Sequence, residues 1–233
     1  EPLTPMSSSA VKGENLALAE AIKKFKAKND FEDLSALTEF VSKFPKSRWT
    51  ASLNSNIADL LYQTGFLSDA MERWQASFEQ SKNERGKLQQ AVANHSIANL
   101  IKANGRVGRM AELEKHLAAI KNRPVWGSDE QKITDAKQGL AGMKTAPGMA
   151  FKCGPYAVHS VMNAIKPGSG FNAEIEKASS TTQGTSLAMV KELAAKAGLK
   201  LQAARREPGA AVVVPSVMHW KLSHFGALVS AKN

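Results

Sequence analysis

Helical periodicity runs almost unbroken from residue 13 to about residue 140 and restricts this part of the chain to an all-α module. Apolar residues recur there at the three-and-four spacing of amphipathic helices. Two such stripes are formed by Ala17, Leu18, Ala21 and Ile22 and by Leu34, Leu37, Phe40 and Val41. A break at residues 44–47, which include a proline, is typical of a turn between helices. We therefore expect a helical module over residues 13–145, preceded by a flexible lead-in at residues 1–12.

Residues 54–78 carry a more specific order of small and large side chains. This order is Ile57-Ala58, Leu61-Tyr62, Gly65, Ala70, Trp74 and Phe78, and a weaker copy 40 residues later has Ala98, Gly105 and Ala111 at the matching places. The pattern resembles tetratricopeptide repeats, in which small residues let paired helices approach and glycine turns the chain. The resemblance implies an irregular array that presents a surface to a protein partner. The alternative is a helical bundle without repeats.

Cys153 is the only cysteine among the 233 residues and opens a second region, which we place at residues 146–233. One cysteine forms no internal disulfide and no zinc cluster. Gly154 and Pro155 follow it, and proline is tolerated in the first turn of a helix. A helix N-terminus favours thiolate over thiol, and the backbone N–H of Cys153 can bind an oxyanion there. The alternative is an inert cysteine packed as a small apolar side chain.

The rest of this region predicts helices followed by strands. Asn172 is suited to cap a short helix, and residues 187–197 form another helical stripe that ends at Gly198. Residues 199–203, 211–217 and 225–229 alternate as strands do. The whole chain is therefore expected to be α+β, with a small antiparallel sheet after the helices.

Four motifs in this region stand in an order known from one family. They are Cys153-Gly154-Pro155 at a helix start, a Gly184-Thr185-Ser186-Leu187 turn into a helix that ends Ala197-Gly198-Leu199, a valine-rich strand with Pro215, and a strand that begins His224-Phe225. Together they resemble the papain-like cysteine peptidases that process double-glycine leader peptides of bacteriocins, over about residues 147–230. The resemblance implies a papain-like domain in which Cys153 is the nucleophile and His224 the general base. His219 is the rival base, only five residues earlier.

Two positions depart from the family pattern. Pro147 stands where the family has a glutamine that helps to bind the oxyanion, and no Asp or Asn strand follows His224, apart from the nominal candidate Asn233. We expect a cysteine peptidase that cleaves a peptide or its own larger precursor, in a domain completed by further sequence. The alternatives are a degenerate peptidase-like domain that binds an extended peptide at an open sheet edge, and a scaffold in which the helical array is the working part.

Charge and hydropathy limit the remaining partners. The net charge is +10, but aromatic residues make up only 6% and the lysines fall at helix-surface spacings, so nucleic-acid binding is not expected. No apolar run is long enough to span a membrane, and we expect a soluble domain without a cofactor or metal. The combination of helical repeats with such a peptidase-like domain is loosely similar to regions of large secreted bacterial proteins with Rhs or YD repeats. It implies a location in the bacterial cell envelope or outside the cell.

Overall fold

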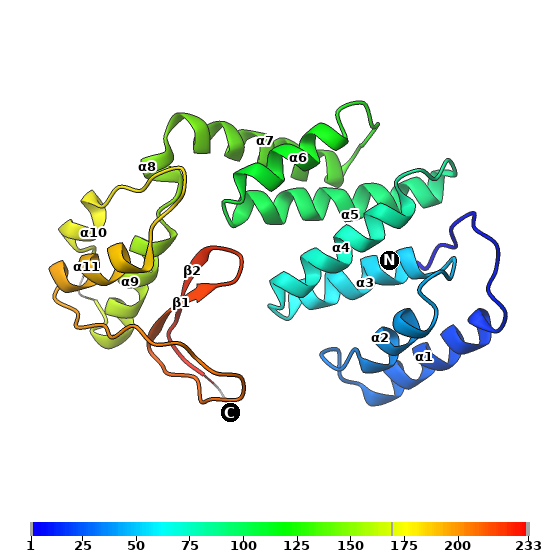
Figure 1. Ribbon diagram of the computed structural model, residues 1–233, viewed down its shortest axis with the longest axis horizontal. Coiled ribbons are helices and arrows are strands. Elements are labelled where there is room, and N and C mark those ends of the chain that lie inside the picture. The colour runs from blue at the N-terminus through cyan, green and yellow to red at the C-terminus, as the bar shows by residue number, and fades with distance from the viewer. Residues whose placement is uncertain (1, 169, 232–233) are drawn as a thin grey trace. The chain divides into compact units, whose positions relative to one another are not determined.

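The structure is a computed structural model that describes residues 2–168 and 170–231 (Figure 1). Over these residues the chain is mostly helical with one antiparallel pair of strands, which confirms the α+β prediction at this coarse level. Two compact units are present. The first unit comprises Glu1–Ala103 and Lys115–Ala136, and the second comprises Asn104–Glu114 and Lys137–Asn233. The division therefore differs from the single boundary expected between residues 145 and 146.

Seven helices account for most of the expected helical module. They are α1 (Glu14–Lys28), α2 (Ser35–Lys43), α3 (Thr50–Gln63), α4 (Leu67–Ser81), α5 (Lys87–Arg106), α6 (Met110–Ala119) and α7 (Ser128–Thr145). The bounds of α5, α6 and α7 show that each helix has residues in both units. Within the described residues, no helix has the length and apolar character required to cross a membrane.

Helices α3 and α4 form a tight antiparallel hairpin. Ala58 on α3 and Ala70 on α4 are completely buried, so the two helices approach with little side-chain bulk between them. Trp74 fills the adjacent space and donates a hydrogen bond from Nε1 to Asp59 at 3.0 Å. Gly65 turns the chain at φ +89°, a conformation that glycine adopts without steric cost. The residues singled out in the sequence therefore occupy the helix contact and the turn.

The weaker copy of this pattern is only partly matched by the structure. Ala98 is completely buried on α5, but Gly105 lies inside that helix rather than at its turn. The chain turns instead at Gly108, where φ is +75°. The prediction that Gly105 turns the chain, as Gly65 does, is therefore wrong. An interior glycine costs a helix only about 1 kcal/mol, and the tertiary contacts of α5 override that cost.

The prediction that residues 1–12 are a flexible lead-in is also wrong. Thr4 and Met6 are buried, and Met6 packs against Ala51 of α3 and Val92 of α5. Backbone amides hold this segment, because Met6 donates to the Arg48 carbonyl at 2.7 Å and Thr4 to the Ser52 hydroxyl at 2.9 Å. One buried apolar side chain and these hydrogen bonds order a stretch whose composition alone is typical of a loop.

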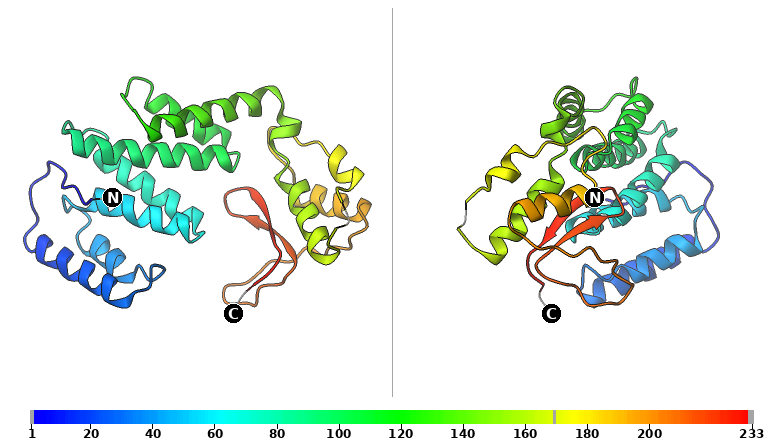
Figure 2. Two further views of the ribbon diagram at one scale, coloured as in Figure 1. Left: turned by 180° about the vertical axis from the view of Figure 1, so that it is seen from behind. Right: turned by 60° about the vertical axis from the view of Figure 1, so that its left-hand side comes forward.

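In the second unit, helix α9 (Cys153–Ile165) packs between a β-hairpin on one side and two shorter helices on the other (Figures 1 and 2). The other elements are α8 (Pro147–Ala150), α10 (Ala173–Lys177), α11 (Leu187–Lys196), β1 (Ser216–Trp220) and β2 (His224–Leu228). Val158 of α9, Ile175 of α10, Val190 of α11 and Phe225 of β2 meet in one buried cluster. This core fixes the start of α9 relative to β2.

Local signals placed these helices well. Asn172 caps α10 by accepting a hydrogen bond from the Glu174 amide at 2.9 Å. Ser186 caps α11 in the same way. Gly198, at φ +88°, follows the end of α11 as expected. The buried stripe of α11 is narrower than predicted, because Leu187 is exposed.

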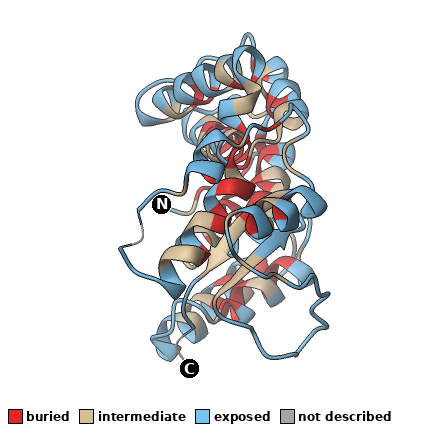
Figure 3. Cartoon of the chain, turned by 90° about the vertical axis from the view of Figure 1, so that its left-hand side faces the viewer, coloured by how far each residue is buried: buried red, intermediate tan, exposed pale blue. Residues whose placement is uncertain are grey.

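Two of the three strand predictions are wrong, one because no strand forms and one because the strand is shorter than expected. Residues 199–203 form no strand, and β1 starts at residue 216 rather than 211. Residues 202–214 are exposed and form the long loop that is pale blue at the lower right of Figure 3. Alternation alone does not make a strand, because a strand needs a partner for its backbone hydrogen bonds. Within the described residues, the named strands β1 and β2 pair only with each other.

Candidate functional site

Cys153 is the first residue of α9, as the sequence predicts. The Tyr156 amide donates to the Lys152 carbonyl at 3.0 Å and closes the first turn. Among the described residues, no backbone carbonyl accepts a hydrogen bond from the amides of Cys153 and Gly154. These two donors lie at the positive end of a 13-residue helix.

Gly154 lets α9 approach α11 at this point. A Cβ atom at position 154 would lie 2.9 Å from Cγ2 of Val190 and 3.1 Å from Cβ of Thr185. Val190 is almost fully buried, so it has little freedom to move away. The absence of a side chain at Gly154 therefore allows Cys153 to lie close to the core of the second unit.

The hairpin register separates the two histidines that competed for the role of base. In β1 and β2, His219 pairs with Phe225 and Trp220 pairs with His224, so the two histidines project from opposite faces. The His219 ring stacks on Phe225 at a centroid distance of 4.4 Å and is exposed. His224 is half-buried and lies beside Trp220, with ring centroids 5.4 Å apart.

Cys153 and His224 line one cavity of about 360 Å³. Its wall consists of Ala150, Lys152, Cys153, Tyr156, Ala157 and Ser160 before and on α9, and His224, Phe225, Gly226 and Ala227 on β2. His219 is not part of this wall. Among the described residues, no hydrogen bond joins the Cys153 thiol to the His224 ring. The cavity brings the two predicted site residues together without direct contact.

The surroundings of His224 favour its neutral form. Burial lowers the pKa of His224 below its usual value, a hydrogen bond to the Val107 backbone opposes this shift, and the positive charge of Arg106 adds to it. A neutral imidazole has a lone pair that can accept a proton. The influence of Val107 could not be predicted from sequence, because Val107 is 117 residues away along the chain.

Of the two positions that depart from the family pattern, the structure describes only Pro147. Pro147 opens α8, does not line the cavity and has no N–H to donate. Asn233, the nominal orienting residue, lies outside the described residues. His159 packs on the Phe171 ring at a centroid distance of 4.0 Å, away from the cavity wall.

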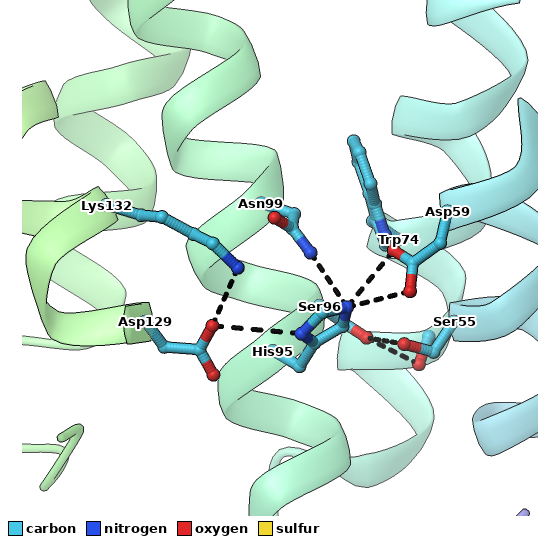
Figure 4. A network of polar contacts seen from close by, with 9 residues as sticks. Ser55, Asp59, Trp74, His95, Ser96, Asn99, Asp129 and Lys132 are labelled. Carbon is cyan, nitrogen blue, oxygen red and sulfur yellow. Dashed lines mark hydrogen bonds and ion pairs between the residues drawn. The ribbon is translucent and has the colours of Figure 1, made fainter. Parts of the chain in front are cut away.

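The first unit contains a second polar cluster, centred on His95 of α5 (Figure 4). Its ring lies between two carboxylates, with Nε2 2.9 Å from Asp59 of α3 and Nδ1 3.7 Å from Asp129 of α7. Lys132 also contacts Asp129, at 2.9 Å. Burial raises the pKa of Asp129, but hydrogen bonds from His95 and Lys132 outweigh it and lower the pKa overall.

Nothing in the sequence predicts this cluster. Its contacts come from helices that are distant in sequence, so neither periodicity nor spacing reveals them. The acidic, basic and ring groups satisfy one another, and they join α3, α5 and α7. We interpret the cluster as a structural one.

Comparisons with known proteins give no assignment. No protein-family model matches the chain, no curated protein is similar to it, and no solved structure resembles it. In the described part of the chain, no group of three or more histidine, cysteine or acidic side chains is arranged to hold a metal ion. A function can therefore be inferred only from the cavity and the residues that line it.

Proposed function

We propose that the chain is a papain-like cysteine peptidase in which Cys153 is the nucleophile and His224 the general base. The observation that carries this proposal is the single cavity that both residues line at the N-terminus of α9. A helix packed on a strand pair, with the thiol at the helix start, also agrees with the family resemblance of residues 147–230.

The proposed reaction uses groups that are already near the cavity. His224 takes the thiol proton, and the sulfur of Cys153 attacks a peptide carbonyl carbon. The amides of Cys153 and Gly154, at the start of α9, would donate to the resulting oxyanion. His224 then returns the proton to the leaving amine, which leaves a thioester on Cys153, and water hydrolyses this thioester to regenerate the thiol.

The helical array, which we propose to be tetratricopeptide-like, would present the substrate or a further protein partner to this site. The substrate is a peptide or a larger precursor of the chain. The loose similarity to large secreted bacterial proteins supports a location in the cell envelope or outside the cell.

Chemical labelling tests the proposal. At pH 6.5, iodoacetamide should alkylate Cys153 about tenfold faster than it alkylates glutathione, since the neutral His224 ring can take the thiol proton as the sulfur attacks. His224→Ala should remove most of this advantage. His219→Ala is the matched control, because His219 lies on the opposite face of the hairpin, and it should leave the rate unchanged. Equal rates in the native protein and His224→Ala would exclude the proposed pair.

A degenerate domain that only binds peptides is the second candidate. Met218 and Trp220, which lie on the same face of the hairpin as His224, are each 38% exposed, and an extended peptide could add to the free edges of the hairpin. Acylation by p-nitrophenyl acetate separates the two functions, because it needs a working nucleophile but no specific substrate. Release of p-nitrophenolate that depends on both Cys153 and His224 supports the peptidase, and its absence supports the binding domain.

A further inference from the structure

The second unit contains another cavity, of about 380 Å³, next to the candidate site. Its wall is formed by Ala146 and α8, by Lys152, and by residues 176–179 at the end of α10. Lys152 also lines the cavity that holds Cys153 and His224. One lysine therefore borders both cavities and directly precedes the proposed nucleophile.

Lys152 is buried to a degree that is unusual for a lysine, with 7% of its surface exposed. Its Nζ donates a hydrogen bond to the Glu176 carbonyl at 2.9 Å. Glu176 lines the second cavity and not the first, so the ammonium lies on the side of the second cavity. Because an ammonium has three N–H groups, this one hydrogen bond leaves two of them for another acceptor.

The positive charge of this ammonium is not neutralised by the part of the chain that the structure describes. No acidic side chain there forms an ion pair with Lys152, because Glu176 contributes its backbone oxygen and not its carboxylate. The other titratable side chains on the wall are Glu176 and Lys177, and both residues are exposed. A buried charge is costly unless an opposite charge pairs with it. The missing negative charge therefore indicates an anion that enters from outside the chain.

The same wall supplies a hydroxyl. A Cβ atom at Gly148 would lie 2.5 Å from Oγ of Ser179, so the absence of a side chain at position 148 leaves room for this hydroxyl. Among the described residues, no group is hydrogen-bonded to it. Two ammonium N–H groups and a hydroxyl suit a carboxylate, whose two oxygens only accept hydrogen bonds. One lysine beside the Glu176 side chain is poorly suited to a doubly charged phosphate, which arginine clusters bind better.

We propose that the second cavity binds a carboxylate of the peptide whose scissile bond lies at Cys153, with Lys152 as its counter-ion. Since Lys152 borders both cavities, one peptide can occupy them together. The carboxylate is either the free C-terminus of the peptide or an acidic side chain next to the scissile bond. This inference rests on the proposed function for the identity of the ligand and adds the class of substrate, a peptide that is anionic near its cleavage site.

Protection of Cys153 from alkylation tests this site. The probes are acetyl-alanyl-alanine with a free C-terminus, its C-terminal amide, and acetyl-glutamyl-alanine amide. A probe that spans both cavities should slow the reaction of iodoacetamide with Cys153, which is the only thiol of the chain. We expect half-protection at about a tenfold lower concentration for a carboxylate probe than for the uncharged amide, because a hydrogen bond to a charged group is worth about that factor. The carboxylate probe that protects identifies its source. Equal protection by all three probes would overturn the inference.

Two lysine variants show whether Lys152 is responsible. Lys152→Met removes the charge and keeps a long buried side chain. Lys166→Met is the matched control, because Lys166 is exposed at the other end of α9. The advantage of the carboxylate probe should vanish in Lys152→Met and persist in Lys166→Met. If it persists in both, the net positive charge of the protein attracts the probe and the inference fails. Lys152→Gln, which can still donate to the Glu176 carbonyl, gives the same comparison if Lys152→Met does not fold.

The outcomes separate the two proposals. If the carboxylate advantage depends on Lys152 but alkylation does not depend on His224, the carboxylate site exists and the peptidase proposal fails. If alkylation depends on His224 but Lys152→Met discriminates between the probes as the native protein does, the peptidase proposal stands and the carboxylate site fails.

Discussion

Gly154→Ala tests how tightly α9 is held against α11. The added Cβ would lie 2.9 Å from Val190 and 3.1 Å from Thr185, well inside the 3.5–4.0 Å at which carbon atoms pack without strain. Both neighbours are β-branched and have restricted rotamers. The Thr185 hydroxyl is also held by a 3.0 Å hydrogen bond to Ser180. Neither side chain can move away easily.

The expected size of the effect follows from two opposing terms. Overpacking of a core costs about 1–3 kcal/mol, whereas alanine is favoured over glycine in a helix by about 1 kcal/mol at most. The net loss for Gly154→Ala should be about 1–2 kcal/mol. Gly142→Ala is the matched control, because Gly142 lies inside α7 in the same unit with no atom within 4 Å. It should stabilise the protein by about 0.5–1 kcal/mol.

Urea unfolding, monitored by ¹⁹F NMR of protein labelled with fluorotryptophan, measures the change in free energy of unfolding separately for each unit. Trp220 is the one tryptophan in the second unit, so its signal reports that unit alone. With an m-value of about 1–2 kcal/mol/M, the midpoint should fall by about 1 M in Gly154→Ala and rise in Gly142→Ala. If Gly154→Ala is as stable as the native protein, the close approach of α9 to α11 is not as described.

Two further predictions concern the titratable residues. His95→Phe leaves the carboxylates of Asp59 and Asp129 without the ring between them, so it should destabilise the first unit by about 1–3 kcal/mol. The ¹⁹F signal of Trp74 during urea unfolding measures this loss. An unchanged urea midpoint would show that the cluster is not structural. The pKa of His224 is lowered in the folded state, so the unfolded chain binds more protons as the pH falls. The contribution of His224 to the free energy of unfolding is therefore present above about pH 6.5 and is lost as the pH falls through the lower pKa of the folded state. His224→Phe should flatten this part of the stability profile of the second unit, and a profile identical to that of the native protein would contradict the shift.

Local chemistry made much of the helical part predictable. Helix α9 begins at Cys153 because proline fits a first turn, and Asn172 caps α10 through its own side chain. Such signals lie within a few residues of the structure that they determine. The strand expected at residues 199–203 failed for the opposite reason, because pairing depends on a partner that the segment itself does not encode.

Of the candidate site, the sequence pointed to two residues of the cavity wall and to little of what surrounds them. Motif order placed Cys153 and His224 in the same domain, and the structure brings both to one cavity. Arg106 and Val107, which influence the pKa of His224, come from the α5–α6 turn, which the sequence assigned to the helical module. No periodicity links this turn to a histidine more than one hundred residues later, so the sequence alone does not predict that influence.

The surroundings of His224 limit the mechanism that we propose. A carboxylate beside a catalytic histidine stabilises the imidazolium, whereas burial and the positive charge of Arg106 disfavour the charged ring of His224. A stable thiolate–imidazolium pair is therefore not what these surroundings favour. They favour a neutral histidine that takes the Cys153 proton as the sulfur attacks, so the proposed peptidase should work by general-base catalysis.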